Sequence, residues 1–389
     1  RGAAGARRCV AHFAAHRWSL SSMCFSSDDR LLCTVGVDEH RRTQVIVWDV
    51  KMLISARRGS GASSVTRAMA VVAKQTSDFP ITRIAFSPFE KKKLVSCGRE
   101  NIRFWRIRRR HLPACPAVLN EYARGSVFTD LAFESPYGAA PGPAPDPGAP
   151  GGTRVVYAST MAGTLMQINY HTRNLLCVLR LHNGPILSLC VNEGFAVTAS
   201  ADRFLRLWPL DFSDFLMEAQ HESAVVSASL SLDGLKVAVG TAAGSVGVLD
   251  VMSHQYTTTL RSHRGKVLAV VHATPPARHW RDGGGGGGGG KGEFATVGED
   301  CTIRVWDLAT GTQRYEFSSP DDPPMCAAYR PAVSSVSVSA DTPSGAATAA
   351  LGPSPGRGLG AAARGDYYSP VGLVAPPPTL SSPAGVGRG

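Results

Sequence analysis

The chain has 389 residues, of which 43% are hydrophobic and 18% charged, and its formal net charge at pH 7 is +11. This length and apolar content suffice to bury a large core. No apolar run approaches the roughly 20 residues of a membrane-spanning helix, and no secretory signal opens the chain. We therefore expect no membrane partner. Because the chain begins at Arg1 rather than Met, we also expect a fragment of a longer protein.

The cysteines predict a reducing compartment. There are nine, which is an odd number, and no two are spaced as a CxxC pair. Several fall in predicted strands, Cys33 and Cys97 among them. Small buried thiols are therefore favoured over disulfides or a zinc site, and we expect no metal and no cofactor.

Six short hairpins recur along the chain. Each combines an apolar β-prone segment, a turn and a second segment of alternating polarity, as in Phe294–Val297, the turn 298–301 and Thr302–Leu308. Four of the second segments end in Trp or Trp-Asp, at Trp48, Trp105, Trp208 and Trp306, and the other two have lost the Trp. The closing positions are 48, 105, 168, 208, 249 and 306, so the spacings are 57, 63, 40, 41 and 57 residues.

This pattern resembles the WD repeat, whose propeller blades have four strands in about 40 to 45 residues. We predict an all-β WD-repeat β-propeller with six recognisable blades and a partial seventh. In chain order, blade one follows His16, with an outer strand at 69–73, and blade two opens at 81–86. The inner strand of blade three is at 128–133. Blades four and five span 177–211 and 215–251, with a helical turn considered within 212–221. Blade six opens at 256–271, and 325–329 would start a seventh.

The domain prediction is a propeller over residues 1–331, as an incomplete ring, followed by a tail over 332–389. Two low-complexity insertions interrupt the propeller, at 135–153 and 274–292, the second with eight consecutive glycines. The insertions and the Pro-, Gly-, Ala- and Ser-rich tail have the composition of disorder. The glycine run follows no strand and opens no helix, so it does not predict a phosphate-binding loop.

Three blades have the side chains that, in WD-repeat proteins, form a buried hydrogen-bonded tetrad. An aspartate follows the threonine by four positions each time, and an incomplete set would leave buried polar groups without partners. The predicted structural tetrads are His16, Thr34, Asp38 and Trp48; His182, Thr198, Asp202 and Trp208; and His263, Thr296, Asp300 and Trp306. Arg99, Ala162 and Ala243 replace the aspartate in the other blades.

A hydrolase constellation is the rejected alternative for these residues. Nucleophilic catalysis needs one exposed hydroxyl beside its base and an oxyanion site, and it gives no reason for three copies. His12 and His16 have the spacing of helical metal ligands, but His16 belongs to a blade. We therefore expect no enzyme and no catalytic residue.

Positive charge is concentrated in the first part of the chain. Residues 1–110 contain 22 Lys and Arg against 8 Asp and Glu, whereas the remainder contains 19 against 22. One interpretation is a solvated basic surface, and the other is a dock for an acidic protein or a nucleic acid. Nucleic acid is disfavoured because no aromatic residues are interleaved with these clusters. The candidate contacts are Arg41, Arg42, Arg57, Arg58, Lys91, Lys92, Lys93, Arg106, Arg108, Arg109 and Arg110.

Four stretches resemble particular families of WD-repeat proteins. Cys33–Val50 and Leu94–Ile107 resemble repeats of the echinoderm microtubule-associated-like proteins. Phe195–Val251 and Glu293–Asp322 are similar to the WD repeat-containing protein 90 family, and the similarity covers roughly Ala11 to Pro331. The chain departs from the family after Ala332, where the seventh blade should continue.

That resemblance implies a scaffold of centrioles and cilia. The implied location is the cytoplasm and cytoskeleton, at the centriole or centrosome and the cilium basal body. The implied partners are centriolar inner-scaffold proteins, with tubulin or microtubules as a further partner. Two alternatives stay open. One is direct binding of the microtubule lattice by the basic first two blades, and the other is a general adaptor role in ubiquitin-ligase or RNA-processing assemblies.

Overall fold

The computed structural model describes most of the repeat region. The described residues are 15–28, 30–50, 70–134, 154–231, 233–259, 261–273, 292–318, 326–328 and 380–381. Arg57, Arg58 and His12, together with the insertions 135–153 and 274–291, lie outside them. Within the described residues no helix is long and apolar enough to cross a membrane.

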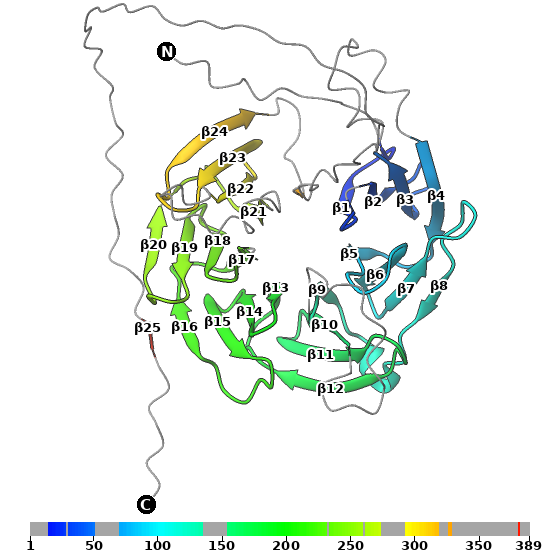
Figure 1. Ribbon diagram of the computed structural model, residues 1–389, viewed down its shortest axis with the longest axis horizontal. Coiled ribbons are helices and arrows are strands. Elements are labelled where there is room, and N and C mark those ends of the chain that lie inside the picture. The colour runs from blue at the N-terminus through cyan, green and yellow to red at the C-terminus, as the bar shows by residue number, and fades with distance from the viewer. Residues whose placement is uncertain are drawn as a thin grey trace, which may run out of the picture.

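Six sheets arranged around a central axis form a β-propeller (Figure 1). Every blade has four antiparallel strands in chain order from the axis outwards, which is the architecture predicted from the sequence. Blade one comprises β1 (Leu20–Phe25), β2 (Leu31–Val37), β3 (Thr43–Asp49) and β4 (Ala70–Ser77). Blade two comprises β5 (Ile81–Phe86), β6 (Lys93–Gly98), β7 (Ile102–Arg106) and β8 (Ala114–Pro116). Blade three comprises β9 (Phe128–Phe133), β10 (Val155–Thr160), β11 (Thr164–Asn169) and β12 (Leu175–Arg180), and the 3-10 turn η3 (Asn120–Ala123) precedes it.

The second half repeats this plan. Blade four comprises β13 (Ile186–Val191), β14 (Phe195–Ser200), β15 (Phe204–Pro209) and β16 (Met217–Gln220). Blade five comprises β17 (Val225–Leu230), β18 (Lys236–Thr241), β19 (Val246–Asp250) and β20 (Tyr256–Thr259). Blade six comprises β21 (Val267–His272), β22 (Glu293–Gly298), β23 (Thr302–Asp307) and β24 (Gln313–Ser318). The two-residue strand β25 (Leu380–Ser381) pairs with β16 at the outer edge of blade four, within the segment predicted as a tail.

The core lies between neighbouring blades because both faces of each sheet are apolar. Val197 and Leu207 of blade four, for example, pack in one cluster with Val237 and Leu249 of blade five. The middle strands are consequently buried on both sides, as β14 and β18 are almost throughout. Burial of this kind, at about 25 cal/mol per Å² of apolar surface, is the main force holding the blades together.

The predicted boundaries of blades four, five and six are wrong by one strand. The segments predicted to open them contain β12, β16 and β20, which are the outermost strands of the preceding blades. The considered helical turn is also wrong, because β16 occupies Met217–Gln220. A repeat period in sequence shows how often strands recur, but it does not show which strand pairs with which neighbour.

Among the described strands the ring is open between blades six and one (Figure 1). Innermost strands pack against one another in succession from β1 to β21, but within the described residues no comparable packing joins β21 to β1. Of the predicted first strand of a seventh blade, at 325–329, only residues 326–328 are described, and these three have no strand pairing.

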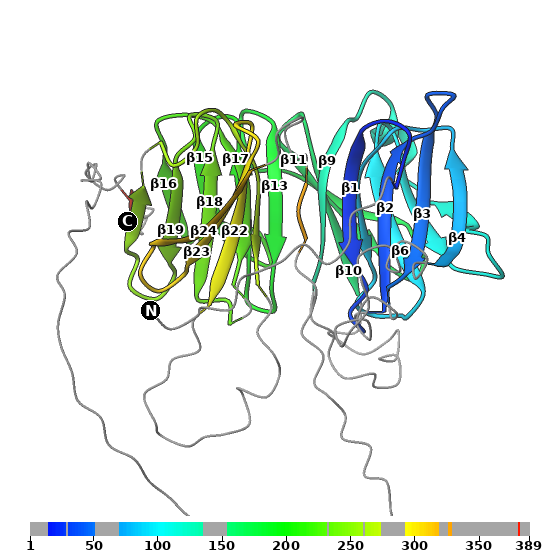
Figure 2. The same ribbon diagram turned by 90° about the horizontal axis from the view of Figure 1, so that it is seen from above.

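The propeller has two faces that differ in their loops (Figure 2). The hairpin face carries the tight turns between the second and third strands of each blade, such as Asp38–Arg42 in blade one. Because successive strands are antiparallel, the loops joining first to second and third to fourth strands emerge on the opposite face. We call it the insertion face, since the ends flanking 51–69, 135–153 and 274–291 lie there.

Candidate functional site

Two of the predicted tetrads form continuous hydrogen-bonded chains. In blade four, Trp208 Nε1 donates to Thr198 Oγ1 at 2.8 Å, and Thr198 Oγ1 lies 2.7 Å from His182 Nε2. His182 Nδ1 is 2.9 Å from Asp202 Oδ2. Since the carboxylate can only accept, Nδ1 donates and Nε2 accepts the threonine proton. Blade six repeats the chain through Trp306, Thr296, His263 and Asp300, with distances of 2.8, 2.8 and 3.0 Å.

Burial sets the charge state of these groups. It lowers the pKa of His182 and His263 below the ordinary histidine value, although the neighbouring aspartates act in the opposite direction. Burial would raise the pKa of Asp300, but hydrogen bonds from Thr302, Arg264 and His263 outweigh it and hold that pKa well below its usual range. The imidazoles are therefore neutral and the carboxylates ionised near pH 7. This arrangement links strands and offers no exposed nucleophile.

Blade one does not complete its tetrad. Trp48 Nε1 and His16 Nε2 lie 2.9 and 3.0 Å from Thr34 Oγ1, but Asp38 instead accepts backbone bonds from His40 and Arg42. His16 Nδ1 has no partner among the described residues. The pairing of β2 with β3 extends to the Val37–Thr43 pair. Asp38 is therefore the first residue of the five-residue turn 38–42 that joins these strands. Blade one therefore keeps the four-residue interval between Thr34 and Asp38, but it lacks the contact between the histidine and the aspartate.

This difference predicts unequal effects of two matched substitutions. Asp202→Ala should lower the free energy of unfolding by about 2 to 3 kcal/mol, because it leaves His182 Nδ1 buried without an acceptor. Asp38→Ala should lower it by about 1 kcal/mol or less, since it removes only turn hydrogen bonds and one exposed ion pair with Arg42. Urea unfolding of both variants would measure the contrast. Equal losses would contradict the assignment of a broken tetrad in blade one.

Blade five contains a substitute for the tetrad that the sequence analysis missed. His221 Nε2 lies 2.7 Å from the hydroxyl of Tyr256, a residue of the outermost strand. The tyrosine ring fits because Gly247 opposes it, where a Cβ atom would overlap the ring. The position of His221 could have revealed it. His221 precedes Val225, the first residue of the innermost strand, by four residues, just as the tetrad residue His182 precedes Ile186. Blade two retains one bond, from Trp105 Nε1 to Ser96 Oγ at 2.8 Å.

The structure separates the candidate cationic contacts into groups. Arg41 and Arg42 lie on the hairpin face, where Arg42 Nε is 3.5 Å from Asp38. Lys91 and Lys92 line a hollow on the insertion face between blades one and two, together with Asp28, Asp49 and Glu90. Lys93 is paired with Glu90 at 2.6 Å. The predicted set is thus divided between opposite faces, and part of it faces carboxylates.

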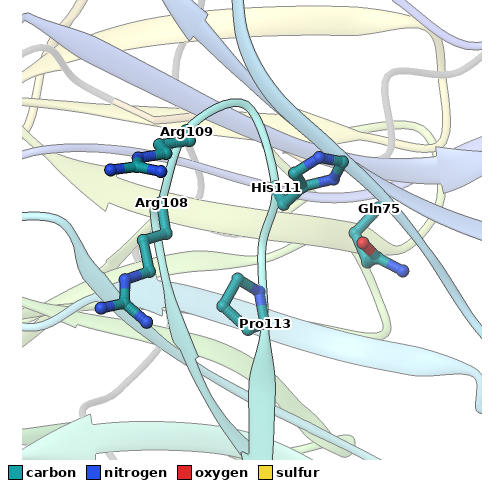
Figure 3. Close-up of a pocket in the computed structure, with 5 residues that line it drawn as sticks. All are labelled: Gln75, Arg108, Arg109, His111 and Pro113. Carbon is teal, nitrogen blue, oxygen red and sulfur yellow. The ribbon is translucent and has the colours of Figure 1, made fainter.

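The arginines after Trp105 form the strongest concentration of positive charge. Arg108 and Arg109 line an open hollow with Gln75, His111 and Pro113 (Figure 3). A second hollow continues from it, since Arg108 and Pro113 line both, and it adds Arg106, Tyr170 and Arg173. We name Arg106, Arg108, Arg109 and Arg173 the arginine trough. No carboxylate is among the described residues that line these two hollows.

Arg173 is a member of the trough that the sequence analysis did not identify. It lies in the β11–β12 turn of blade three, where its carbonyl accepts from Val118 N at 2.9 Å. The β7–β8 loop with Arg108 is the equivalent connection of blade two. An alignment of blades two and three at their closing positions, 105 and 168, would have shown that the two turns are equivalent. Arg173 was not identified because it is a single arginine outside any cluster of positive charge in the sequence.

Metal chemistry finds no support in the part of the chain that the structure describes. No group of three or more His, Cys, Asp or Glu side chains there could hold an ion. Cys33 and Cys97 are buried, and burial raises the pKa of each thiol. The functional feature of the described surface is therefore the set of charged side chains carried by the loops of the propeller.

Comparison with known proteins agrees with this architecture. The family described as "WD domain, G-beta repeat" matches residues 7–49, 173–209 and 254–307. WD repeat-containing protein 90 is 34% identical over 343 residues in Xenopus tropicalis, covering 83% of this chain and 17% of that protein. The Homo sapiens protein is 34% identical over 344 residues, covering 83% and 18%. Centriole proteome protein 16 of Chlamydomonas reinhardtii is 34% identical over 269 residues, covering 66% and 12%. The chain thus spans less than a fifth of these relatives.

Proposed function

We propose that this chain, which belongs to the WD repeat-containing protein 90 family of WD-repeat proteins, is a non-enzymatic scaffold of centrioles and basal bodies. It binds centriolar proteins through propeller loops and supports centriole integrity and cilium assembly. The observation that carries the proposal is similarity over 83% of the chain to proteins of that name, with a centriole proteome protein among the relatives. A propeller suits this role because its packed blades present many loops on two faces.

Proximity labelling tests the scaffold role. The full chain fused to a biotin ligase and expressed in ciliated cells should label centriolar inner-scaffold proteins above the level given by an unrelated propeller with the same fusion. Labelled material indistinguishable from that control would refute the proposal. Enrichment of ubiquitin-ligase or RNA-processing components instead would support the general adaptor.

Direct binding to the microtubule lattice is a second candidate, favoured by the cluster Arg106, Arg108 and Arg109 of blade two, for which the described part of the chain provides no ion pair. Co-sedimentation of the full chain with microtubules, at low and moderate salt, tests it. A binder should pellet at low salt, lose binding as salt screens its charges, and lose it when Arg106, Arg108, Arg109 and Arg110 are changed to Glu. No pelleting of the unmodified chain would eliminate this candidate and leave the scaffold proposal standing.

A further inference from the structure

The arginine trough concentrates positive charge on one part of the surface. Within the described residues no ion pair involves Arg106, Arg108, Arg109 or Arg173, and no carboxylate is among the described residues that line the two hollows. The neighbouring hollow between blades one and two contains both signs of charge. The trough is therefore a local concentration of guanidinium groups without counter-charges from the described chain, and it attracts carboxylates from outside.

The β7–β8 loop, which bears Arg108 and Arg109 of the trough, has a backbone conformation that disfavours most side chains. Arg108 and His111 exchange backbone hydrogen bonds of 2.9 and 2.8 Å, so Arg109 and Arg110 are the two central residues of a tight turn. Both have positive φ, 42° and 71°. Such turns favour Asn-Gly, and a side chain in the left-handed region is disfavoured relative to glycine. Arginine at both positions therefore makes the turn less stable than Asn-Gly would, and it places two guanidinium groups at the tip of the β7–β8 loop.

The turn is also supported from behind. Lys74 N of β4 donates to the Arg110 carbonyl at 3.3 Å, and Ile107 N donates to the Lys92 carbonyl at 2.9 Å. The loop is therefore attached both to blade one and to the first turn of its own blade. A loop whose backbone is already held in place loses less backbone entropy on binding than a free loop.

The shape and the nearby aromatic rings indicate the class of partner. The first hollow is open and shares Arg108 and Pro113 with the second, which suits a chain lying across both rather than a small molecule enclosed in a pocket. Of the rings that line the hollows, Trp105 and Tyr170 are only 2% and 4% exposed and offer no platform for stacking bases, whereas Phe104 is half-buried and His111 and His171 are exposed. Guanidinium groups pair with carboxylates through two parallel hydrogen bonds.

We propose that the arginine trough binds an extended glutamate-rich peptide segment of a partner protein. The proposal rests on the proposed function in that it takes the propeller to be a protein-binding platform, and it names the chemistry of one partner and the surface it uses. Glutamates along an extended segment would lie across the Arg108–Arg109 tip and continue toward Arg173.

Fluorescence anisotropy of a labelled decaglutamate peptide, titrated with the full chain, tests the proposal. Binding should weaken about tenfold or more when salt rises from about 50 mM to about 200 mM, as screening of several exposed charges requires. The double variant Arg108→Glu/Arg109→Glu should weaken binding by about tenfold or more. The double variant Arg41→Glu/Arg42→Glu changes net charge equally on the opposite face and should alter affinity by less than about twofold.

A third variant separates binding from folding. Arg109→Asn/Arg110→Gly supplies the residues that the turn prefers, so it should raise the melting temperature while weakening peptide binding about threefold or more. Equal loss of affinity in the two charge-reversal variants would overturn the proposal, as would absence of binding by the unmodified chain. Equal binding of a decathymidylate with the same sensitivity to the variants would assign the trough to nucleic acid instead.

The outcomes also separate this inference from the scaffold proposal. Failure of the peptide to bind, with centriolar labelling intact, removes the trough as an acidic-peptide site and leaves the scaffold. If the peptide binds but centriolar proteins are not labelled, the trough remains an acidic-peptide site and the centriolar scaffold role is refuted.

Discussion

The Thr198→Val substitution is expected to lower the free energy of unfolding by about 3 kcal/mol. Thr198 is completely buried, and its hydroxyl both accepts from Trp208 Nε1 and donates to His182 Nε2. Valine has nearly the same shape, so the apolar packing is retained while two buried polar atoms lose their partner. Each such orphan destabilises a protein by about 1 to 3 kcal/mol. Urea denaturation followed by tryptophan fluorescence would measure the loss.

Ser96→Ala in blade two provides the graded control. The Ser96 hydroxyl accepts a hydrogen bond from Trp105 Nε1 at 2.8 Å, and among the described residues no histidine completes a chain there. Its loss should lower the free energy of unfolding by about 1 kcal/mol. If both variants lost the same amount, the histidine and aspartate of blade four would contribute nothing to the network, and the tetrad would be reduced to a tryptophan-hydroxyl pair.

Acidification from about pH 7.5 to about pH 5.5 is expected to destabilise the propeller. Burial lowers the pKa of five histidines, His16, His182, His221, His263 and His272. In the unfolded chain each would titrate near 6.5. Between the folded and unfolded pKa values the unfolded chain binds more protons, so stability falls as pH falls below 6.5. The ionised tetrad aspartates do not contribute in this window, because their pKa values lie below it.

His272 supplies the clearest share of this effect. Burial lowers its pKa to about 4, and neither ring nitrogen has a hydrogen-bond partner among the described residues. Its contribution over this pH interval is about 1.4 kcal/mol. His272→Leu should therefore unfold with a pH dependence smaller by that amount, as measured by melting temperature at the two pH values. An unchanged pH dependence would show that this imidazole is protonated in the folded chain.

The sequence contained enough information for the repeat and for most of the tetrad chemistry. Hairpins closing at Trp48, Trp208 and Trp306 predicted blades that the structure contains. Spacing alone failed for Asp38, since a four-residue interval fits both a tetrad and a turn cap, and the longer β2–β3 ladder decides between them. The His221–Tyr256 pair was missed because its partner comes from the outermost strand.

Local patterns by themselves determined that the chain is all-β, that its blades recur, and that positive charge is concentrated in the first two. Alternation of side chains along a strand and the composition of turns are properties of neighbouring residues, so they are readable without coordinates. Only the tertiary structure decided which strand closes each blade, that Arg41 and Arg108 lie on opposite faces, and that Arg173 joins Arg108. Those facts depend on pairing and packing between residues far apart in the chain, which a linear charge count cannot resolve.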